Sequence, residues 1–202
     1  MRGAALVPVQ SRRNVLKIGF SPPHDKVASP KKSVKNPMIF VALGANLDSP
    51  AHGPPTRTLE AALALLDRDD CRVVRRSRWY ESAPVPASDQ PWFVNGVAEI
   101  ATGLSPACLL ARLHAVEAEI GRVRGVPDAP RVVDLDLLAY GEEVLDGPAA
   151  PIVPHPRLHR RAFVLLPLRE LAPGWVDPRS GRSVEQLIAG LPPGQVCRPL
   201  KL

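Results

Sequence analysis

Cysteines are few in this chain, aromatic residues make up only 4% of it, and it has no long apolar run. Cys71, Cys108 and Cys197 are an odd number without metal-ligand or redox spacing, so neither a disulfide framework nor a zinc site is predicted. A reducing, cytoplasmic setting is the one we expect. No apolar run approaches the roughly 20 residues that span a bilayer, which argues against a membrane protein.

Two glycine-rich nucleotide motifs are also missing. The chain contains no Gly-x-x-x-x-Gly-Lys, which excludes a P-loop kinase, and no Gly-x-Gly-x-x-Gly, the mark of a dinucleotide-binding fold. Any nucleotide site must therefore be built in another way.

Lysine is nearly absent beyond residue 37, where Lys201 is the only one. The chain has 26 Lys/Arg and 20 Asp/Glu, a formal charge of +6. Residues 1–37 hold eight of these basic residues and one acid, a net of +7, so the remaining 18 and 19 give −1. Residues 38–202 are therefore not basic, and this argues against a nucleic-acid-binding protein.

Residues 1–37 carry no sustained apolar period and are interrupted by five prolines. This composition predicts a disordered basic arm ahead of a domain spanning residues 38–202. A transit peptide is one alternative. The break at Met38 favours a start site assigned upstream of the real one.

From residue 39 onward the apolar pattern predicts the order strand, helix, strand, strand, helix, strand. We expect strands at 39–43, 72–80, 93–101 and 132–140, and helices at 59–66 and 105–120. An apolar segment at 162–171 and an amphipathic segment at 184–191 follow. This order is typical of an α+β, ferredoxin-like sandwich with an antiparallel sheet.

The most informative stretch is residues 121–141, which combines arginines with paired aspartates. Because strand side chains alternate, Asp134 and Asp136 share one face of the strand opposite Val133, Leu135 and Leu137. Two carboxylates so placed suit magnesium, which also takes substrate phosphates. Alone, the aspartates could form a solvated strand face and the arginines a surface loop. Adjacent to one another, they favour phosphate chemistry.

A second feature is the loop at 80–92, in which three prolines exclude regular structure. The scarce aromatics Tyr80, Trp92 and Phe93 gather here, as a site for a flat heterocycle would require. Core packing is the alternative for Phe93 and for Phe163.

Four blocks of residues, in order, resemble the 6-hydroxymethyl-7,8-dihydropterin pyrophosphokinase family of folate biosynthesis. They are GANL at 44–47, YESAPVPASDQPWFVNGV at 80–97, EAEIGRVR with PRVVDLDLLAYG within 117–141, and VPHPRLHRRAFVLLPL at 153–168. The resemblance runs from Met38 to about Leu171. It implies a ferredoxin-like fold and transfer of pyrophosphate from ATP, as co-substrate, to the pterin hydroxymethyl group, with release of AMP.

The resemblance also implies roles for single residues. Asp134 and Asp136 would hold two magnesium ions, and Arg122 and Arg131 would neutralise charge during transfer. The ATP contacts would be His114, Glu117, Arg124, His155 and Arg161. The pterin contacts would be Ser82, Ala83, Val85, Phe93, Asn95 and Phe163. The implied partners are these small molecules, with no nucleic acid, membrane or obligate protein partner.

The sequence departs from the family pattern at two places. Asp128-Ala129-Pro130-Arg131 stands where well-known members carry Trp-Gly-Pro-Arg, and Pro156 replaces an aromatic residue that often follows the histidine. Two other classes compete with this interpretation. One is a ferredoxin-like nucleic-acid-binding module, which lacks a basic face here, and the other is a metal-dependent phosphohydrolase.

The composition break generates the first prediction. A chain beginning at Met38 should match the full chain in melting temperature and in activity, because residues 1–37 add no apolar surface to a core. Thermal unfolding of both chains tests this, and a fall of several degrees in the shorter chain would contradict it.

Overall fold

The computed structural model describes residues 37–123, 129–147 and 151–201. The predicted basic arm lies outside the described residues, except for Pro37. The elements in chain order are β1 (Ile39–Ala45), α1 (Pro55–Leu66), β2 (Cys71–Arg76), β3 (Tyr80–Ser82), β4 (Phe93–Thr102), α2 (Pro106–Ile120), β5 (Asp134–Tyr140), the 3-10 turn η1 (Leu158–Arg160), α3 (Ala162–Leu171), α4 (Val184–Ala189) and β6 (Cys197–Pro199).

The strands form one sheet in the order β5-β1-β4-β3-β6, with β2 also pairing with β4. Every pairing between these strands is antiparallel. The first and last strands of the βαββαβ pattern, β1 and β5, are neighbours, because each helix carries the chain across the sheet. The predicted ferredoxin-like α+β sandwich is confirmed.

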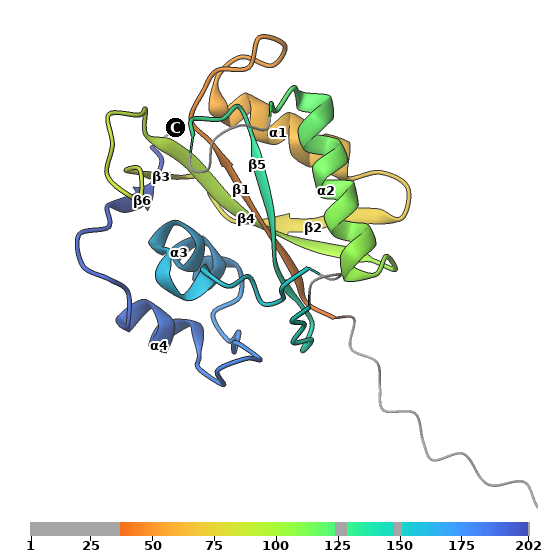
Figure 1. Ribbon diagram of the computed structural model, residues 1–202, viewed down its shortest axis with the longest axis vertical. Coiled ribbons are helices and arrows are strands. Elements are labelled where there is room, and N and C mark those ends of the chain that lie inside the picture. Colours follow the sequence, from red (N-terminus) through yellow and green to blue (C-terminus); the bar gives the residue numbers. More distant parts are fainter. Residues whose placement is uncertain (1–36, 124–128, 148–150, 202) are drawn as a thin grey trace, which may run out of the picture. The chain divides into compact units, whose positions relative to one another are not determined.

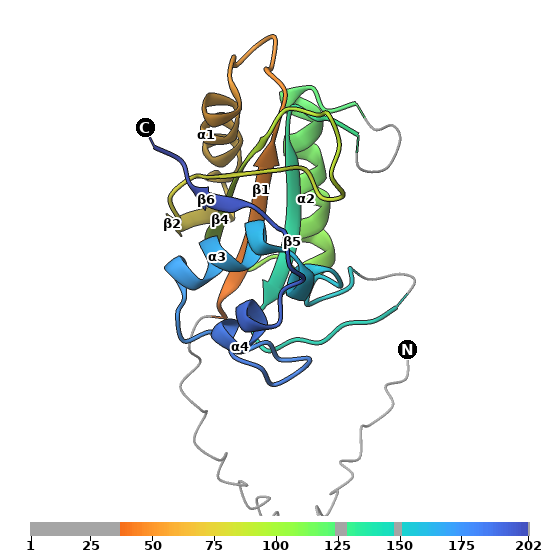
Figure 2. The same cartoon turned by 90° about the vertical axis from the view of Figure 1, so that its left-hand side faces the viewer.

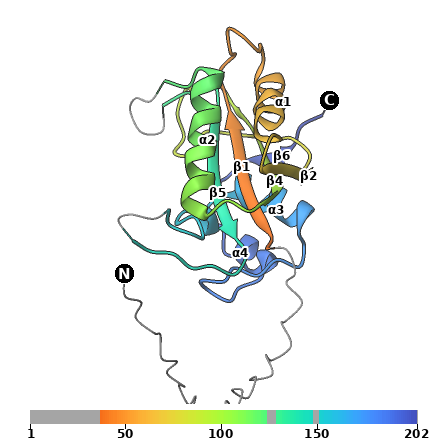
Figure 3. The same cartoon turned by 90° about the vertical axis from the view of Figure 1, so that its right-hand side faces the viewer.

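Helices cover both faces of this sheet. Figure 1 shows α1 and α2 over one face and α3 and α4 over the other, and Figures 2 and 3 show the same two layers from the sides. Each face has its own core: Val41 and Leu43 of β1 pack toward α1 and α2, whereas Phe40 packs toward α3 and α4. The central strand β1 is therefore buried on both faces and carries no charged side chain, as buried strands usually do not. None of the helices in the described stretches has the length and apolar character needed to cross a bilayer.

The helix predicted around residues 105–120 is confirmed, and so are the residues that begin and end it. The Ser105 side chain accepts a hydrogen bond from the Cys108 N–H, Pro106 occupies the first turn, and Gly121 ends the helix in the left-handed conformation at φ 98°. This ending turns the chain back toward β5, so it brings Arg122 to Asp134 at the start of that strand.

The single strand predicted at residues 72–80 is wrong, because the structure divides it into β2 and β3. Between β2 and β3, the Val97 N–H donates to the Ser77 hydroxyl at 3.1 Å instead of to a backbone carbonyl. The Trp79 ring then packs into the core over Gly96, where a Cβ would lie 2.6 Å from the ring. A side chain thus interrupts the strand, which an apolar pattern does not reveal.

Sequence reasoning also missed strand β6. Residues 197–199 pair with β3, and the Ala83 N–H donates to the Val196 carbonyl at 3.1 Å. Two prolines and a glycine precede this short strand in Leu191-Pro192-Pro193-Gly194, and three residues are too few to show an alternating apolar pattern that would predict a strand. As a result, the end of the described chain lies beside the loop at residues 83–92, called here the proline-rich loop.

The close contact at Gly96 generates a stability prediction. Gly96→Ala should lower the free energy of unfolding by about 1–3 kcal/mol, because the added methyl group overpacks the buried Trp79 ring. Gly103→Ala is the matched control, since a Cβ at exposed Gly103 meets nothing within 4 Å. Urea unfolding of the two variants measures the difference, and equal losses would contradict the packing argument.

Candidate functional site

A cavity of about 260 Å³ opens on the face of the sheet that carries α3. The side chains of β1 explain its position. On this face Phe40 is buried among α3 and α4, but the next two residues, Ala42 and Gly44, are small and line the cavity. The sheet is therefore filled at one end and hollow at the other.

Asp134 and Asp136 of β5 lie at this hollow, directly opposite Gly44 and Ala42 in the strand register. Leu135 points to the other face, into the core with α1 and α2. The prediction that the two aspartates share one face away from the leucines is confirmed. The strand can carry two carboxylates because small neighbours leave them room beside solvent.

Two arginines hold Asp134 from opposite sides. Arg131 donates to Asp134 Oδ2 at 2.7 Å, and Arg122 donates to Asp134 Oδ1. Both arginine side chains are 19% exposed and line the cavity. The arginines and the aspartates predicted as the catalytic set are thus brought together.

Glu117 lies behind Arg122 rather than in the cavity. Its side chain is 2% exposed, and one carboxylate oxygen accepts the Arg122 guanidinium and the Leu135 N–H, the latter at 2.8 Å. Burial raises the pKa of the Glu117 carboxyl, against the opposing effects of the Leu135 N–H and Arg122. Burial also acts to lower the pKa of Arg122, but Asp134 and Glu117 outweigh it and raise that pKa. Glu117 therefore positions Arg122.

Asn46 fixes the loop that carries Arg131. It is 3% exposed, and its side-chain oxygen accepts the Arg131 N–H at 2.8 Å. Its amide nitrogen donates to Gln90 Oε1 and to the Pro91 carbonyl of the proline-rich loop. Sequence reasoning gave Asn46 no role, although a polar residue directly after a buried strand is a usable signal.

The other side of the cavity suits a flat, polar ring. The six residues predicted for the pterin all line it: Ser82, Ala83, Val85, Phe93, Asn95 and Phe163. Asn95 is 4% exposed and donates to the Ser82 hydroxyl at 2.9 Å. Amide and hydroxyl groups therefore meet at the wall of a cavity that two aromatic residues also line.

Asp136 faces a second cationic group. Arg161 lies 3.6 Å from its carboxylate and also lines the cavity, and the Arg161 guanidinium is 5.4 Å from the centre of the Phe163 ring. His155 Nε2 is 3.9 Å from Asp136 Oδ2. Burial lowers the pKa of His155, and Arg161 and Arg157 act in the same direction against Asp136. The imidazole is thus favoured in its neutral form beside the carboxylate.

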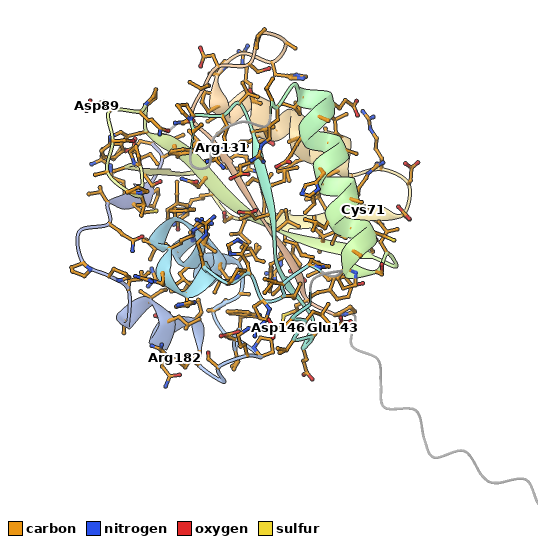
Figure 4. All side chains as sticks on the ribbon, in the orientation of Figure 1. Cys71, Asp89, Arg131, Glu143, Asp146 and Arg182 are labelled. Carbon is orange, nitrogen blue, oxygen red and sulfur yellow. The ribbon has the colours of Figure 1, made fainter. Side chains whose placement is uncertain are left out.

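The remaining predicted ATP contacts are placed differently. His114 lies exposed on α2 and does not line the cavity, and Arg124 lies outside the described residues. In Figure 4, Arg131 is labelled near the start of β5 and Asp146 near its far end, which locates the charged site at the upper end of the strand.

Within the described ranges, no three His, Cys, Asp or Glu side chains gather into a complete metal cage. Magnesium does not require one, because it commonly takes one or two carboxylates and completes its shell with water and substrate phosphates. Asp134 and Asp136 at an open hollow fit that donor set.

The fold and the site together define a class: a ferredoxin-like α+β sandwich with a cluster of arginines and aspartates at a cavity that is also lined by aromatic, amide and hydroxyl side chains. Comparison with known proteins identifies the family. A sequence profile described as 7,8-dihydro-6-hydroxymethylpterin-pyrophosphokinase (HPPK) matches residues 40–173. The chain belongs to this family.

Curated relatives agree with this assignment. The chain is 44% identical over 155 residues to 2-amino-4-hydroxy-6-hydroxymethyldihydropteridine pyrophosphokinase of Pseudomonas aeruginosa, covering 76% of this chain and 91% of that protein. It is 42% identical over 149 residues to the protein of the same name from Synechocystis, covering 73% of each. The match to the folate synthesis bifunctional protein, mitochondrial, of pea is 34% identical over 170 residues, 82% of this chain and 31% of that protein.

Solved structures agree on the fold. The crystal structure of wild-type Plasmodium falciparum HPPK-DHPS with STZ-DHP matches with a TM-score of 0.60 at 13% identity, over 77% of this chain and 43% of that chain. At this identity the match concerns the fold alone.

The buried position of Glu117 generates a prediction that needs no ligand. Glu117→Ala should lower the free energy of unfolding by about 3–5 kcal/mol, because it leaves the Arg122 charge and the Leu135 N–H without this partner. Glu119→Ala, at an exposed position of the same helix, should stay within about 0.5 kcal/mol of wild type. Urea unfolding at neutral pH compares them, and a small loss for Glu117→Ala would show that Glu117 does not position Arg122.

Proposed function

We propose that this chain transfers the pyrophosphoryl group of ATP to the hydroxymethyl oxygen of 6-hydroxymethyl-7,8-dihydropterin, giving the pterin diphosphate and AMP. Membership of the HPPK family and the names of the curated relatives support the reaction. The observation that carries the proposal in this chain is a single cavity that is lined both by Arg122, Arg131 and the two aspartates and by Phe93, Asn95 and Phe163.

The charged side of the cavity is assigned to the triphosphate. Asp134 and Asp136 would hold magnesium, two ions in this proposal, which when bound neutralises charge on phosphate oxygens. Arg122 and Arg131 pair with Asp134 and line the same cavity. Their planar guanidinium groups can exchange a carboxylate for a phosphate and bind it through two parallel hydrogen bonds.

Arg161 and His155 are assigned to ATP binding, as are Arg124 and His114. Arg161 and His155 both approach Asp136, so they lie where the nucleotide phosphates must come if Asp136 is to share a metal with them. A neutral His155 can donate one hydrogen bond without adding charge. We assign Glu117 to this set through Arg122, since its own carboxylate is buried.

The polar side of the cavity is assigned to the pterin. Phe93 and Phe163 offer ring faces, and the Asn95 side chain offers an amide to the edge of the heterocycle. The backbone of Ser82, Ala83 and Val85 provides further donors and acceptors. In this arrangement the hydroxymethyl group of the pterin faces the arginines across the cavity.

The proposed step forms a bond between the hydroxymethyl oxygen and the β-phosphorus, and it breaks the bond from the β-phosphorus to the oxygen it shares with the α-phosphate. AMP leaves with that oxygen, and the proton of the hydroxyl group is released to solvent. Positioning and charge neutralisation provide most of the catalysis of such transfers. In this proposal Arg122, Arg131, Asp134 and Asp136 would supply both.

The reaction is tested by its nucleotide product. Purified protein with ATP, magnesium and 6-hydroxymethyl-7,8-dihydropterin should give AMP and pterin diphosphate in equal amounts, separated by chromatography. ADP would indicate a monophosphate kinase, and ATP breakdown without pterin would indicate a phosphohydrolase; either result contradicts the proposal.

Asp136→Ala should reduce the rate by roughly 10³-fold or more, because metal neutralisation is worth several kcal/mol. Asp146→Ala, a carboxylate beyond the far end of β5 that does not line the cavity, is the matched control.

A further inference from the structure

The C-terminal segment Gln195–Cys197 contacts both walls of the cavity. One wall is formed by Ser82 and Ala83, and the other by the segment 160–163, which carries Arg161 and Phe163. These walls are about 80 residues apart in the sequence. Nothing in the proposed function uses the C-terminal segment.

Gln195 makes the contact to the second wall. Its side-chain oxygen accepts the Ala162 N–H at 2.9 Å, and its amide nitrogen donates to the Arg160 carbonyl at 2.9 Å. The same nitrogen lies 3.5 Å from the Pro192 carbonyl. The two stronger bonds reach the residues immediately before and after Arg161, so one amide group fixes the backbone on both sides of that arginine.

The start of α3 explains why such a partner is needed. The first N–H groups of a helix have no partner within the helix, and a side-chain oxygen at the N-cap commonly accepts one of them. Here Arg161 is the N-cap of α3, and its side chain makes no capping bond. Its guanidinium instead points to Asp136 and to the Phe163 ring. Gln195 therefore supplies, from a distant part of the chain, the acceptor that a serine or aspartate would supply locally.

The residues after Gln195 make the contact to the first wall. The Val196 carbonyl accepts the Ala83 N–H at 3.1 Å, and Cys197 is paired with Ser82 in the strand register. The Leu200 N–H donates to the Trp79 carbonyl at 2.8 Å, which extends the attachment past β6. Gln195 is therefore joined within one residue to the wall that carries Ser82.

We propose that Gln195 is a positioning residue that sets the spacing of the pterin slot. Through its bonds to Arg160 and Ala162 it holds Phe163 and Arg161 at a fixed distance from Ser82 and Ala83, to which Val196 and Cys197 are attached. This inference rests on the proposed function, because it takes the slot between these walls as the pterin site. Removal of the amide changes no residue that lines the slot. It breaks the attachment of residues 160–162 to the C-terminal segment at the start of α3, while Tyr80 and Glu170 still join β3 to α3 farther along the helix.

The test compares two identical substitutions. Gln195→Met keeps the length of the side chain and removes both hydrogen bonds. Gln186→Met is the matched control, because Gln186 also bonds backbone near a helix N-terminus, accepting the Ser183 N–H at the start of α4, and does not line the cavity. Gln195→Met loses the two hydrogen bonds to Arg160 and Ala162, next to the residues that line the slot. This loss should raise KM for the pterin by roughly tenfold, with a smaller rise in KM for ATP.

A purely structural role gives a different result. A loss of folded protein alone lowers the apparent kcat of both variants and leaves KM unchanged, since the molecules that remain folded have an intact slot. A pterin KM of Gln195→Met within about twofold of wild type, or an equal rise in Gln186→Met, overturns the proposal.

A second measurement needs no substrate and separates this inference from the reaction itself. Amide hydrogen exchange of Ala162 and Ala83 in the ligand-free protein should speed up in Gln195→Met and remain unchanged in Gln186→Met. If wild-type protein makes no AMP from the pterin, the proposed function is wrong, and this exchange still decides whether Gln195 holds the walls together. Unchanged exchange at Ala162 in Gln195→Met overturns the positioning role.

Discussion

The ion-pair network around Asp134 is the interaction on which the site depends. It joins a helix, a loop and a strand: Glu117 of α2 holds Arg122, Arg122 and Arg131 hold Asp134, and Asn46 holds the backbone of Arg131. Removing one partner from a partly buried network leaves an uncompensated charge, so its members are coupled in stability. The network also keeps the guanidinium groups of Arg122 and Arg131 at the cavity.

The same network has a consequence for phosphate recognition. The aspartates offset only part of the positive charge around the hollow, which is lined by Arg122, Arg131, Arg157 and Arg161 against Asp134 and Asp136. In the proposed function, a polyphosphate with its metal ions would offer each arginine an anion and each aspartate a cation. Each charged group would then exchange one oppositely charged partner for another, which would limit the desolvation cost of bringing highly charged groups into a partly buried site.

The hollow itself comes from packing on the two faces of the sheet. On the face under α1 and α2 the side chains of β1 and β5 are large and fill a continuous core. On the opposite face Phe40 and Trp175 pack edge to face, with ring centres 6.5 Å apart, whereas Ala42 and Gly44 leave space. A Cβ at Gly44 would lie 3.2 Å from the Asn95 oxygen, so the small residue also allows the polar wall to approach the strand. One face stabilises the domain, and half of the other is free for chemistry.

The sequence by itself determined the fold class and most of the cavity lining. Period-2 alternation placed Asp134 and Asp136 opposite Leu135 and Leu137, and a capping serine and a terminal glycine bounded α2, because these are local properties of backbone geometry. Only the tertiary structure decided that Glu117 is buried behind Arg122, that Ser77 divides one expected strand into two, and that Gln195 caps α3. Each of these depends on a side chain that bonds backbone or an ion across the fold. Such pairings are set by which elements the sheet brings together, and no spacing along the chain encodes them.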